Sequence, residues 1–160
     1  MSTDTWGPDL WHIVHTIAKA YPLKPSPRDK NIAYQMTKYM ALILPCKKCS
    51  THYINNFTKY KPELDSGPSF FKWTVRMHNF VNKLNHKKFY TPEKAFRESA
   101  NVLSSKRMSS LFAYLMKETR YGNVSKTALI KFIDTLTYLS RYSSGEWQIP
   151  SNRDIRTRRI

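Results

Sequence analysis

Apolar residues recur along this chain at intervals of three and four positions, the spacing that places side chains on one face of an α-helix. The expected helices are one opened by Gly7 and Pro8 and ended by Pro22, one from Ser26 to Pro45, one beginning around Cys46, one from Phe70 to Leu84, one from Thr91 to Ala100, and two more over 106–118 and 126–142. Proline stands in the first turn of most of them, where its missing N–H would be unpaired anyway. Because no useful length alternates with period two, the pattern predicts an all-α protein, a helical bundle.

The two cysteines, Cys46 and Cys49, are separated by two residues, a spacing that suits several kinds of chemistry. A chain of 160 residues can bury a core without disulfides, so the pair is not needed as a staple. Three interpretations remain open: a redox pair, half of a zinc site, or an inert pair. Zinc would need two further ligands from the histidines, whose spacing resembles no zinc finger. The histidines are His12, His15, His52, His78 and His86.

The position of the pair favours redox chemistry. Pro45 breaks the chain just before Cys46, so Cys46 is expected at the head of a helix, where unpaired N–H groups and the helix dipole stabilise a thiolate. Lys47 and Lys48 add positive charge between the sulfurs, although surface solubility explains them equally well. Together these features should lower the pKa of a thiol and make its thiolate available at neutral pH. In thioredoxin-like proteins a strand precedes the cysteine pair, whereas no strand is expected before Cys46 here.

Charge and targeting signals limit the class of protein. Lysine and arginine number 27 against 11 aspartates and glutamates, and the net charge of +16 favours nucleic acids, phosphate-bearing cofactors and acidic proteins. Neither a membrane span nor a signal peptide is recognisable, so the expected location is a cytosol, where structural disulfides are rare. We expect the basic end to be a solvated tail, with packing on nucleic acid or in a virion as the alternative. Its arginines are Arg153, Arg156, Arg158 and Arg159.

A second polar constellation lies in WTVRMHNFVNKLNHKK, residues 73–88. On a helix His78, Asn82 and Asn85 fall on neighbouring turns, so imidazole and carboxamide groups line one side. Buried amides need partners, because an unpaired one costs about 1–3 kcal/mol. A bound polar cofactor would supply them, although each residue alone is more often a satisfied core histidine or a helix cap.

Three segments follow one another over residues 6 to about 90: GPDLWHIVHTIAKAYP, LPCKKC and FFKWTVRMHNFVNKLNHKK. Together, and in this order, they resemble the Erv/ALR family of FAD-linked sulfhydryl oxidases. Each motif alone is weak, but three in register are specific. The resemblance implies a four-helix bundle with a short fifth helix, with FAD at the mouth of the bundle and the CxxC pair against the flavin ring.

The resemblance also assigns roles to residues. Cys49 would be the sulfur beside the flavin, and Cys46 the more exposed sulfur that exchanges with substrate. The protein would form disulfides in protein substrates and pass electrons through FAD to O2, giving H2O2. The implied FAD-binding residues are Gly7, Trp11, His15, Cys49, His78, Asn79, Val81, Asn82 and Lys87.

The chain departs from the family pattern in two places. Many members carry a second CxxC pair that this sequence lacks, so a protein dithiol would meet Cys46 directly or through a thioredoxin-like carrier. Short members of this kind resemble those of large cytoplasmic DNA viruses, which implies a host cytoplasm or a virion. The family pattern also implies a homodimer. A tryptophan that members often carry beyond Lys87 is missing, and Phe89, Tyr90 or Phe96 would replace it.

We therefore expect an FAD-binding oxidase domain over 1–95, a helical extension over 96–150 that packs on the bundle or forms an interface, and a basic tail over 151–160. The alternative function is a basic helical module that binds zinc or nucleic acid without catalysis. The colour of the purified protein separates the two hypotheses, because only the oxidase would hold a yellow flavin.

Overall fold

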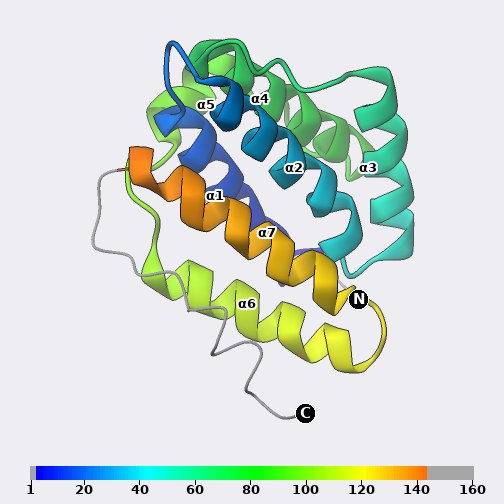
Figure 1. The fold of residues 1–160 in the computed structure, drawn as a ribbon. Helices are drawn as coiled ribbons and strands as arrows, with labels where there is room; N and C mark the ends of the chain where they lie inside the picture. The colour runs from blue at the N-terminus through cyan, green and yellow to red at the C-terminus, as the bar shows by residue number, and fades with distance from the viewer. Residues whose placement is uncertain (1–2, 144–160) are drawn as a thin grey trace.

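The structure is a computed structural model that describes residues 3–143, and within that range every regular element is a helix (Figure 1). The elements are α1 (Gly7–Ala20), α2 (Pro27–Ile43), α3 (Lys47–Lys59), α4 (Gly67–Leu84), α5 (Pro92–Glu98), α6 (Ser105–Arg120), α7 (Lys126–Leu139) and a short 3-10 helix, η1 (Ser140–Tyr142). Proline lies in the first turn of α1, α2, α4 and α5. The all-α prediction is confirmed, while the basic tail over 151–160 lies outside the described residues.

Two predicted helix ends differ from the structure. The fifth helix stops at Glu98, and Ala100 lies beyond it. Lys19 of α1 caps this end: its ammonium group donates to the Phe96 carbonyl at 2.7 Å and to the Ser99 carbonyl at 2.9 Å. The Phe96 carbonyl is the one to which the Ala100 N–H would donate in a longer helix. The segment predicted as one helix over 126–142 ends its α-helical part at Leu139 and continues as η1.

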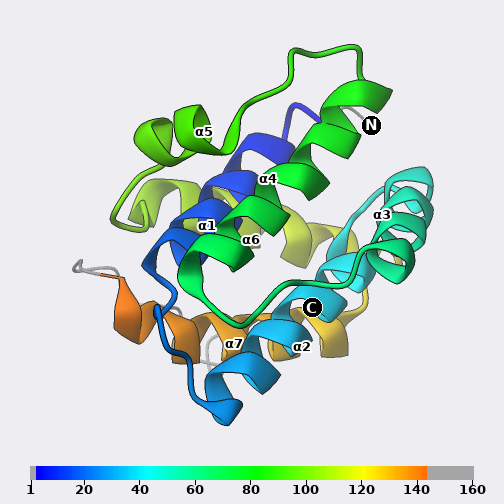
Figure 2. The ribbon, with the colours of Figure 1, turned by 90° about the horizontal axis from the view of Figure 1, so that it is seen from above.

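Helices α1 to α5 form the part of the fold that carries the two cysteines. Within it α1 packs against α4, α3 contacts both α2 and α4, and α5 packs on α4. Helix α7 lies along α2, as both views show (Figures 1 and 2). Helix α6 contacts α1. One hydrophobic core runs through all of these helices, so the last two enlarge the core of the bundle.

A buried carboxylate joins α7 to the start of α2. Asp29 is 3% exposed and accepts hydrogen bonds from the Ser26 backbone N–H at 2.8 Å, the Tyr138 hydroxyl at 2.9 Å and the Tyr142 hydroxyl at 2.8 Å. Burial by itself raises the pKa of Asp29, but these hydrogen bonds outweigh it and hold the pKa below its ordinary value. The carboxylate therefore serves both as part of the α2 capping box and as an anchor for the end of α7.

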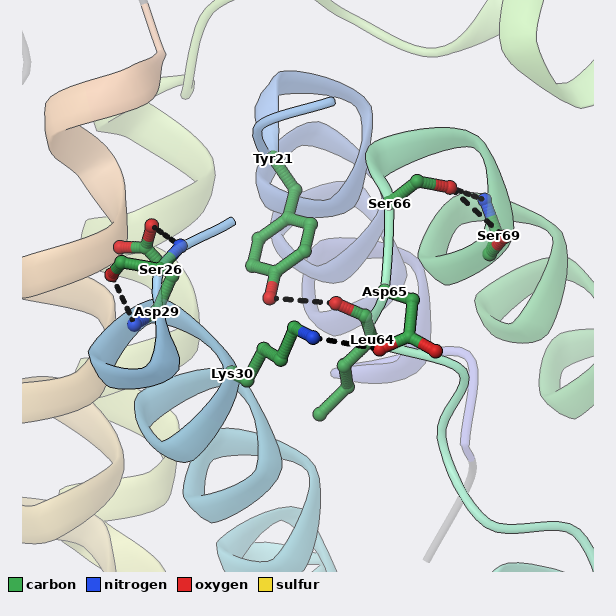
Figure 3. Close-up of polar contacts among 8 residues, drawn as sticks. All are labelled: Tyr21, Ser26, Asp29, Lys30, Leu64, Asp65, Ser66 and Ser69. Atoms are coloured by element: carbon green, nitrogen blue, oxygen red, sulfur yellow. Dashed lines mark hydrogen bonds and ion pairs between the residues drawn. The ribbon is translucent and has the colours of Figure 1, made fainter. Parts of the chain in front are cut away.

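The turns at one end of the bundle are tied to each other (Figure 3). The Tyr21 hydroxyl donates to the Leu64 carbonyl at 3.1 Å, and Lys30 pairs with Asp65 at 2.8 Å. Next to them the Gly67 N–H donates to the Pro22 carbonyl at 2.8 Å, and a Cβ on Gly67 would collide with the Tyr21 carbonyl. The end of α1 is thus fixed against the start of α4, and these two helices bear His15 and His78, the histidines expected to bind FAD.

None of the described helices has the length and apolarity to cross a membrane.

Candidate active site

A cavity of about 300 Å³ lies between the start of α1, the first turns of α3 and the end of α4. The loop after α4 closes one side of it, and the residues before α1 close another. Its wall brings together residues from Thr3 to Tyr90, segments that lie far apart in the sequence. The predicted site residues in the wall are Gly7, Trp11, Cys49, His78, Val81, Asn82 and Lys87.

The two cysteines form a disulfide at the head of α3. Cys46 is the N-cap residue of α3, and its sulfur accepts a hydrogen bond from the Cys49 backbone N–H at 3.2 Å. Cys49 belongs to the cavity wall, whereas Cys46 does not. The Ser50 hydroxyl donates to the Ala41 carbonyl at 2.6 Å and ties this turn to α2. The arrangement places one cysteine of the disulfide in the cavity wall and leaves the other outside it.

Two histidines from α1 and α4 contact each other beside the cavity. His78 of α4 is part of the wall, and His15 of α1 lies behind it. His15 Nε2 is 2.9 Å from His78 Nδ1, and His15 Nδ1 is 3.0 Å from the Thr74 hydroxyl. Burial, helped by the charge of His78, lowers the pKa of His15 to about 3. Burial, helped by the charge of Lys87, lowers the pKa of His78 to about 4. Both imidazoles are therefore neutral near pH 7, and only His78 contributes to the cavity wall.

An aromatic face completes this side of the cavity. The indole of Trp11 stacks on the His78 ring with centroids 4.2 Å apart and planes 6° apart. Stacked rings bury a large area with little loss of side-chain freedom, so this pair gives the wall a flat, rigid surface.

Two buried donors in the wall lack partners among the described residues. They are the Asn82 side-chain amide nitrogen and the Trp6 indole nitrogen, in residues that are 4% and 5% exposed. A buried polar group without a partner costs about 1–3 kcal/mol. The cavity is therefore suited to a ligand that is flat and carries hydrogen-bond acceptors.

The loop after α4 supplies positive charge. Lys87 and Lys88 line the cavity, and Lys87 pairs at 3.1 Å with Asp4, which also lines it. Asn79 is absent from this wall, because its amide is used by the loop: it donates to the Tyr90 carbonyl at 2.8 Å and accepts from the Tyr90 N–H at 3.0 Å. These bonds hold the loop so that Tyr90 enters the wall.

Of the three aromatic candidates for the missing tryptophan, Tyr90 alone lines this cavity. Phe89 is 63% exposed, and Phe96 packs edge-on against Phe71 with centroids 5.2 Å apart. His15 also lies outside the wall and acts on the cavity through His78.

Several wall residues were missed by the sequence analysis. His52 and Tyr53 lie three and four positions after Cys49, so helical spacing could have placed all three on one face. Trp6 and Asp4 precede the first helix, and no sequence pattern pointed to them. Between residues 3 and 143 no group of three or more His, Cys, Asp or Glu side chains is arranged to hold a metal ion.

Comparison with known proteins places this geometry in a family. A model described as the Erv1 / Alr family matches residues 8–102, more than half of the chain. The protein belongs to the Erv1/Alr family. This membership confirms the resemblance inferred from the three sequence motifs.

Individual relatives of this Erv1/Alr protein agree. It is 34% identical over 113 residues to a probable FAD-linked sulfhydryl oxidase of Acanthamoeba polyphaga mimivirus, a match that covers 69% of this chain and 79% of that protein. It is 27% identical over 77 residues to an FAD-linked sulfhydryl oxidase of Arabidopsis thaliana, covering 48% of this chain but only 40% of the plant protein. The yeast Erv1 core structure aligns with a TM-score of 0.57 at 23% identity, over 59% of this chain and 80% of that chain. The helical fold is therefore shared with solved Erv1 structures.

Proposed function

We propose that this protein is an FAD-linked sulfhydryl oxidase that forms disulfides in protein substrates. The observation that carries the proposal is that Cys49, half of a CxxC disulfide, lies in the wall of a cavity lined by stacked aromatic rings and unpaired buried donors. Relatives from a virus, a plant and yeasts are named FAD-linked sulfhydryl oxidases. The alternative of a zinc- or nucleic-acid-binding module is not favoured by these relatives.

The residues of the cavity fit FAD in their chemistry. The Trp11–His78 stack offers a flat face to a ring system, and Asn82 and Trp6 offer donors to its acceptor atoms. Lys87 and Lys88 offer positive charge to a diphosphate. When bound, FAD supplies the electron acceptor for the Cys46–Cys49 dithiol and passes two electrons to O2, which yields H2O2.

Disulfide transfer to a substrate begins at Cys46 in this proposal. A substrate thiolate attacks the Cys46 sulfur, the Cys46–Cys49 bond breaks, and the Cys49 thiolate leaves. A second substrate thiolate then attacks the substrate sulfur of the mixed disulfide and releases the Cys46 thiolate. The substrate loses two electrons and the enzyme pair gains them. The Cys49 N–H on the Cys46 sulfur, together with the N-terminus of α3, stabilises the released thiolate.

We also propose the partners and the location. The Cys46–Cys49 pair would receive electrons from a protein dithiol directly or from a thioredoxin-like carrier. The chain has 27 basic and 11 acidic residues, and this positive charge favours an acidic partner. The mimivirus relative supports a role in the host cytoplasm of a large DNA virus or within its virion. A homodimer is part of the same proposal. The size and molar mass of the protein in solution would test the homodimer.

The first test is flavin content and oxygen consumption. The purified protein should carry bound flavin and consume O2 with dithiothreitol as the thiol donor. Cys46→Ser and Cys49→Ser should each abolish oxygen consumption while flavin stays bound, because either change removes the disulfide but neither removes the cavity. Thr51→Ser, at an exposed position on the same helix, is the matched control and should keep full activity. A colourless protein that takes up no added FAD, or turnover retained in Cys49→Ser, would contradict the proposal.

A further inference from the structure

A line of three hydrogen bonds runs from the backbone of α4 through α1 and back to α4. The Thr74 hydroxyl lies 2.7 Å from the Phe71 carbonyl oxygen, and Thr74 is fully buried. A carbonyl oxygen can only accept, so the Thr74 hydroxyl donates its hydrogen to the Phe71 carbonyl oxygen. The Thr74 oxygen then has only lone pairs to offer to His15, and His15 Nδ1, 3.0 Å away, must donate.

The state of His15 fixes that of His78. A neutral imidazole carries one N–H, and in His15 this N–H is on Nδ1, which leaves a lone pair on Nε2. The His78 Nδ1, 2.9 Å from that lone pair, must therefore carry a hydrogen. Both rings are buried enough for their pKa values to lie well below 7, so each stays neutral. In His78 the remaining nitrogen, Nε2, keeps its lone pair and has no hydrogen-bond partner among residues 3–143.

We propose that Thr74 is a positioning residue that fixes the tautomers of His15 and His78, so that His78 presents a hydrogen-bond acceptor at Nε2 to the occupant of the cavity. Thr74 itself is not part of the cavity wall and acts only through the two rings. The stack of Trp11 on His78 supports this role, because it limits rotation of the ring.

The cavity wall then offers both a hydrogen-bond acceptor and several donors. His78 accepts, whereas Asn82, Trp6 and the lysines Lys87 and Lys88 donate. This step rests on the proposed FAD-linked function. An N–H or hydroxyl group of the cofactor would pair with His78, and the diphosphate, which at neutral pH only accepts, would be disfavoured there and favoured beside the lysines.

The experiment is nitrogen NMR of the full-length protein labelled with ¹⁵N-histidine, recorded with and without bound flavin. Long-range proton–nitrogen couplings report which ring nitrogen carries the hydrogen. In the wild type both His15 and His78 should be protonated on Nδ1 near pH 7. Thr74→Val keeps the shape of the side chain but removes the acceptor, so both rings should shift towards Nε2 protonation. Thr74→Ser keeps the hydroxyl and should restore the wild-type spectrum.

His12 is an internal control in the same spectra. Its Nε2 accepts the Ser104 backbone N–H at 2.9 Å, so a neutral His12 also carries its hydrogen on Nδ1. Because this bond involves α6 rather than Thr74, the His12 signals should not change in either variant.

Flavin affinity is the second readout. Thr74→Val should bind FAD at least about 10-fold more weakly than Thr74→Ser, because a donor placed against a donor leaves buried groups unpaired. Nε2 protonation of His78 in the wild type, unchanged tautomers in Thr74→Val, or equal flavin affinities in the two variants would each overturn the proposal. If the protein binds no flavin, the proposed function fails, yet the tautomers measured in the flavin-free protein still decide the role of Thr74.

Discussion

Two asparagines on α4 show how the same side chain can have opposite roles at the scale of one residue. Asn82 is buried in the cavity wall with its amide nitrogen unpaired, whereas Asn79 uses both ends of its amide on the Tyr90 backbone. The family resemblance placed both in the FAD-binding set, in the motif that also contains His78. Their roles depend on which backbone or cavity lies opposite each, which helical spacing alone does not determine.

Replacement of Asn82 should weaken cofactor binding without weakening the fold. Asn82→Leu removes a donor that has no protein partner among the described residues, so the free energy of unfolding of the flavin-free protein should stay within about 1 kcal/mol of the wild type or rise. FAD affinity should fall about 10-fold because the ligand loses a hydrogen bond inside the cavity. Urea unfolding of the flavin-free protein and flavin titration measure the two effects.

Asn79→Leu is the matched control for that experiment. It removes two satisfied hydrogen bonds to Tyr90 and should destabilise the flavin-free protein by about 1 kcal/mol or more. An Asn82→Leu protein that is strongly destabilised but keeps full FAD affinity would show that Asn82 is a core residue instead.

At the scale of helices, hydrogen bonds between distant segments accompany the apolar packing of the last two helices. His12 of α1 accepts the Ser104 N–H at the start of α6, and Arg107 of α6 reaches the Pro8 carbonyl at 3.3 Å. The Ser125 N–H, at the start of α7, donates to the Leu42 carbonyl, near the end of α2, at 3.4 Å. The sequence predicted each of these helices but did not predict which helices contact each other.

Asp29 should contribute strongly to the docking of α7. Asp29→Ala unpairs the hydroxyls of Tyr138 and Tyr142 and removes the carboxylate that accepts the Ser26 N–H in the α2 capping box, so we expect a loss of about 3 kcal/mol in the free energy of unfolding. Tyr142→Phe removes one of these bonds and should lose only about 1 kcal/mol. Urea unfolding checks both, and equal losses in the two variants would contradict a shared carboxylate anchor.

For the whole molecule, the neutral histidines make stability depend on pH. In the folded protein burial lowers the pKa of His15 to about 3 and of His78 to about 4, whereas both titrate near their ordinary 6.5 in the unfolded chain. Below 6.5 the unfolded chain binds protons that the folded protein does not, so stability is fully present above that pH and is lost on acidification.

Urea unfolding of the flavin-free protein should therefore show a fall in stability as pH decreases from 6.5 towards 4. Each unit of pKa difference corresponds to about 1.4 kcal/mol, so the loss should reach several times that amount. His78→Gln should flatten the profile, because one of the two titrating groups is removed. Stability that is constant or rises over this range would show that the imidazoles are not held neutral.

Much of the fold followed from local sequence signals, and the exceptions have physical causes. Apolar spacing and proline positions gave each helix, because both act within a few residues of the chain. The fifth helix was predicted two residues too long, and its end is capped by Lys19, about eighty positions away, which no local pattern indicates. Ile54, Leu84 and Phe96 are apolar residues of helical segments but are 43%, 41% and 47% exposed, and exposure depends on how distant segments pack rather than on local spacing.

The sequence by itself determined the helices, the CxxC pair at a helix start and the family, because each depends on residues within one turn or on motifs in order. Only the tertiary structure decided which side chains meet. It joined His15 to His78 across 63 positions, directed the amide of Asn79 to Tyr90, and placed Cys49 but not Cys46 in the cavity wall. The physical reason is that hydrogen-bond partners and burial are set by the packing of whole helices, which no local spacing specifies.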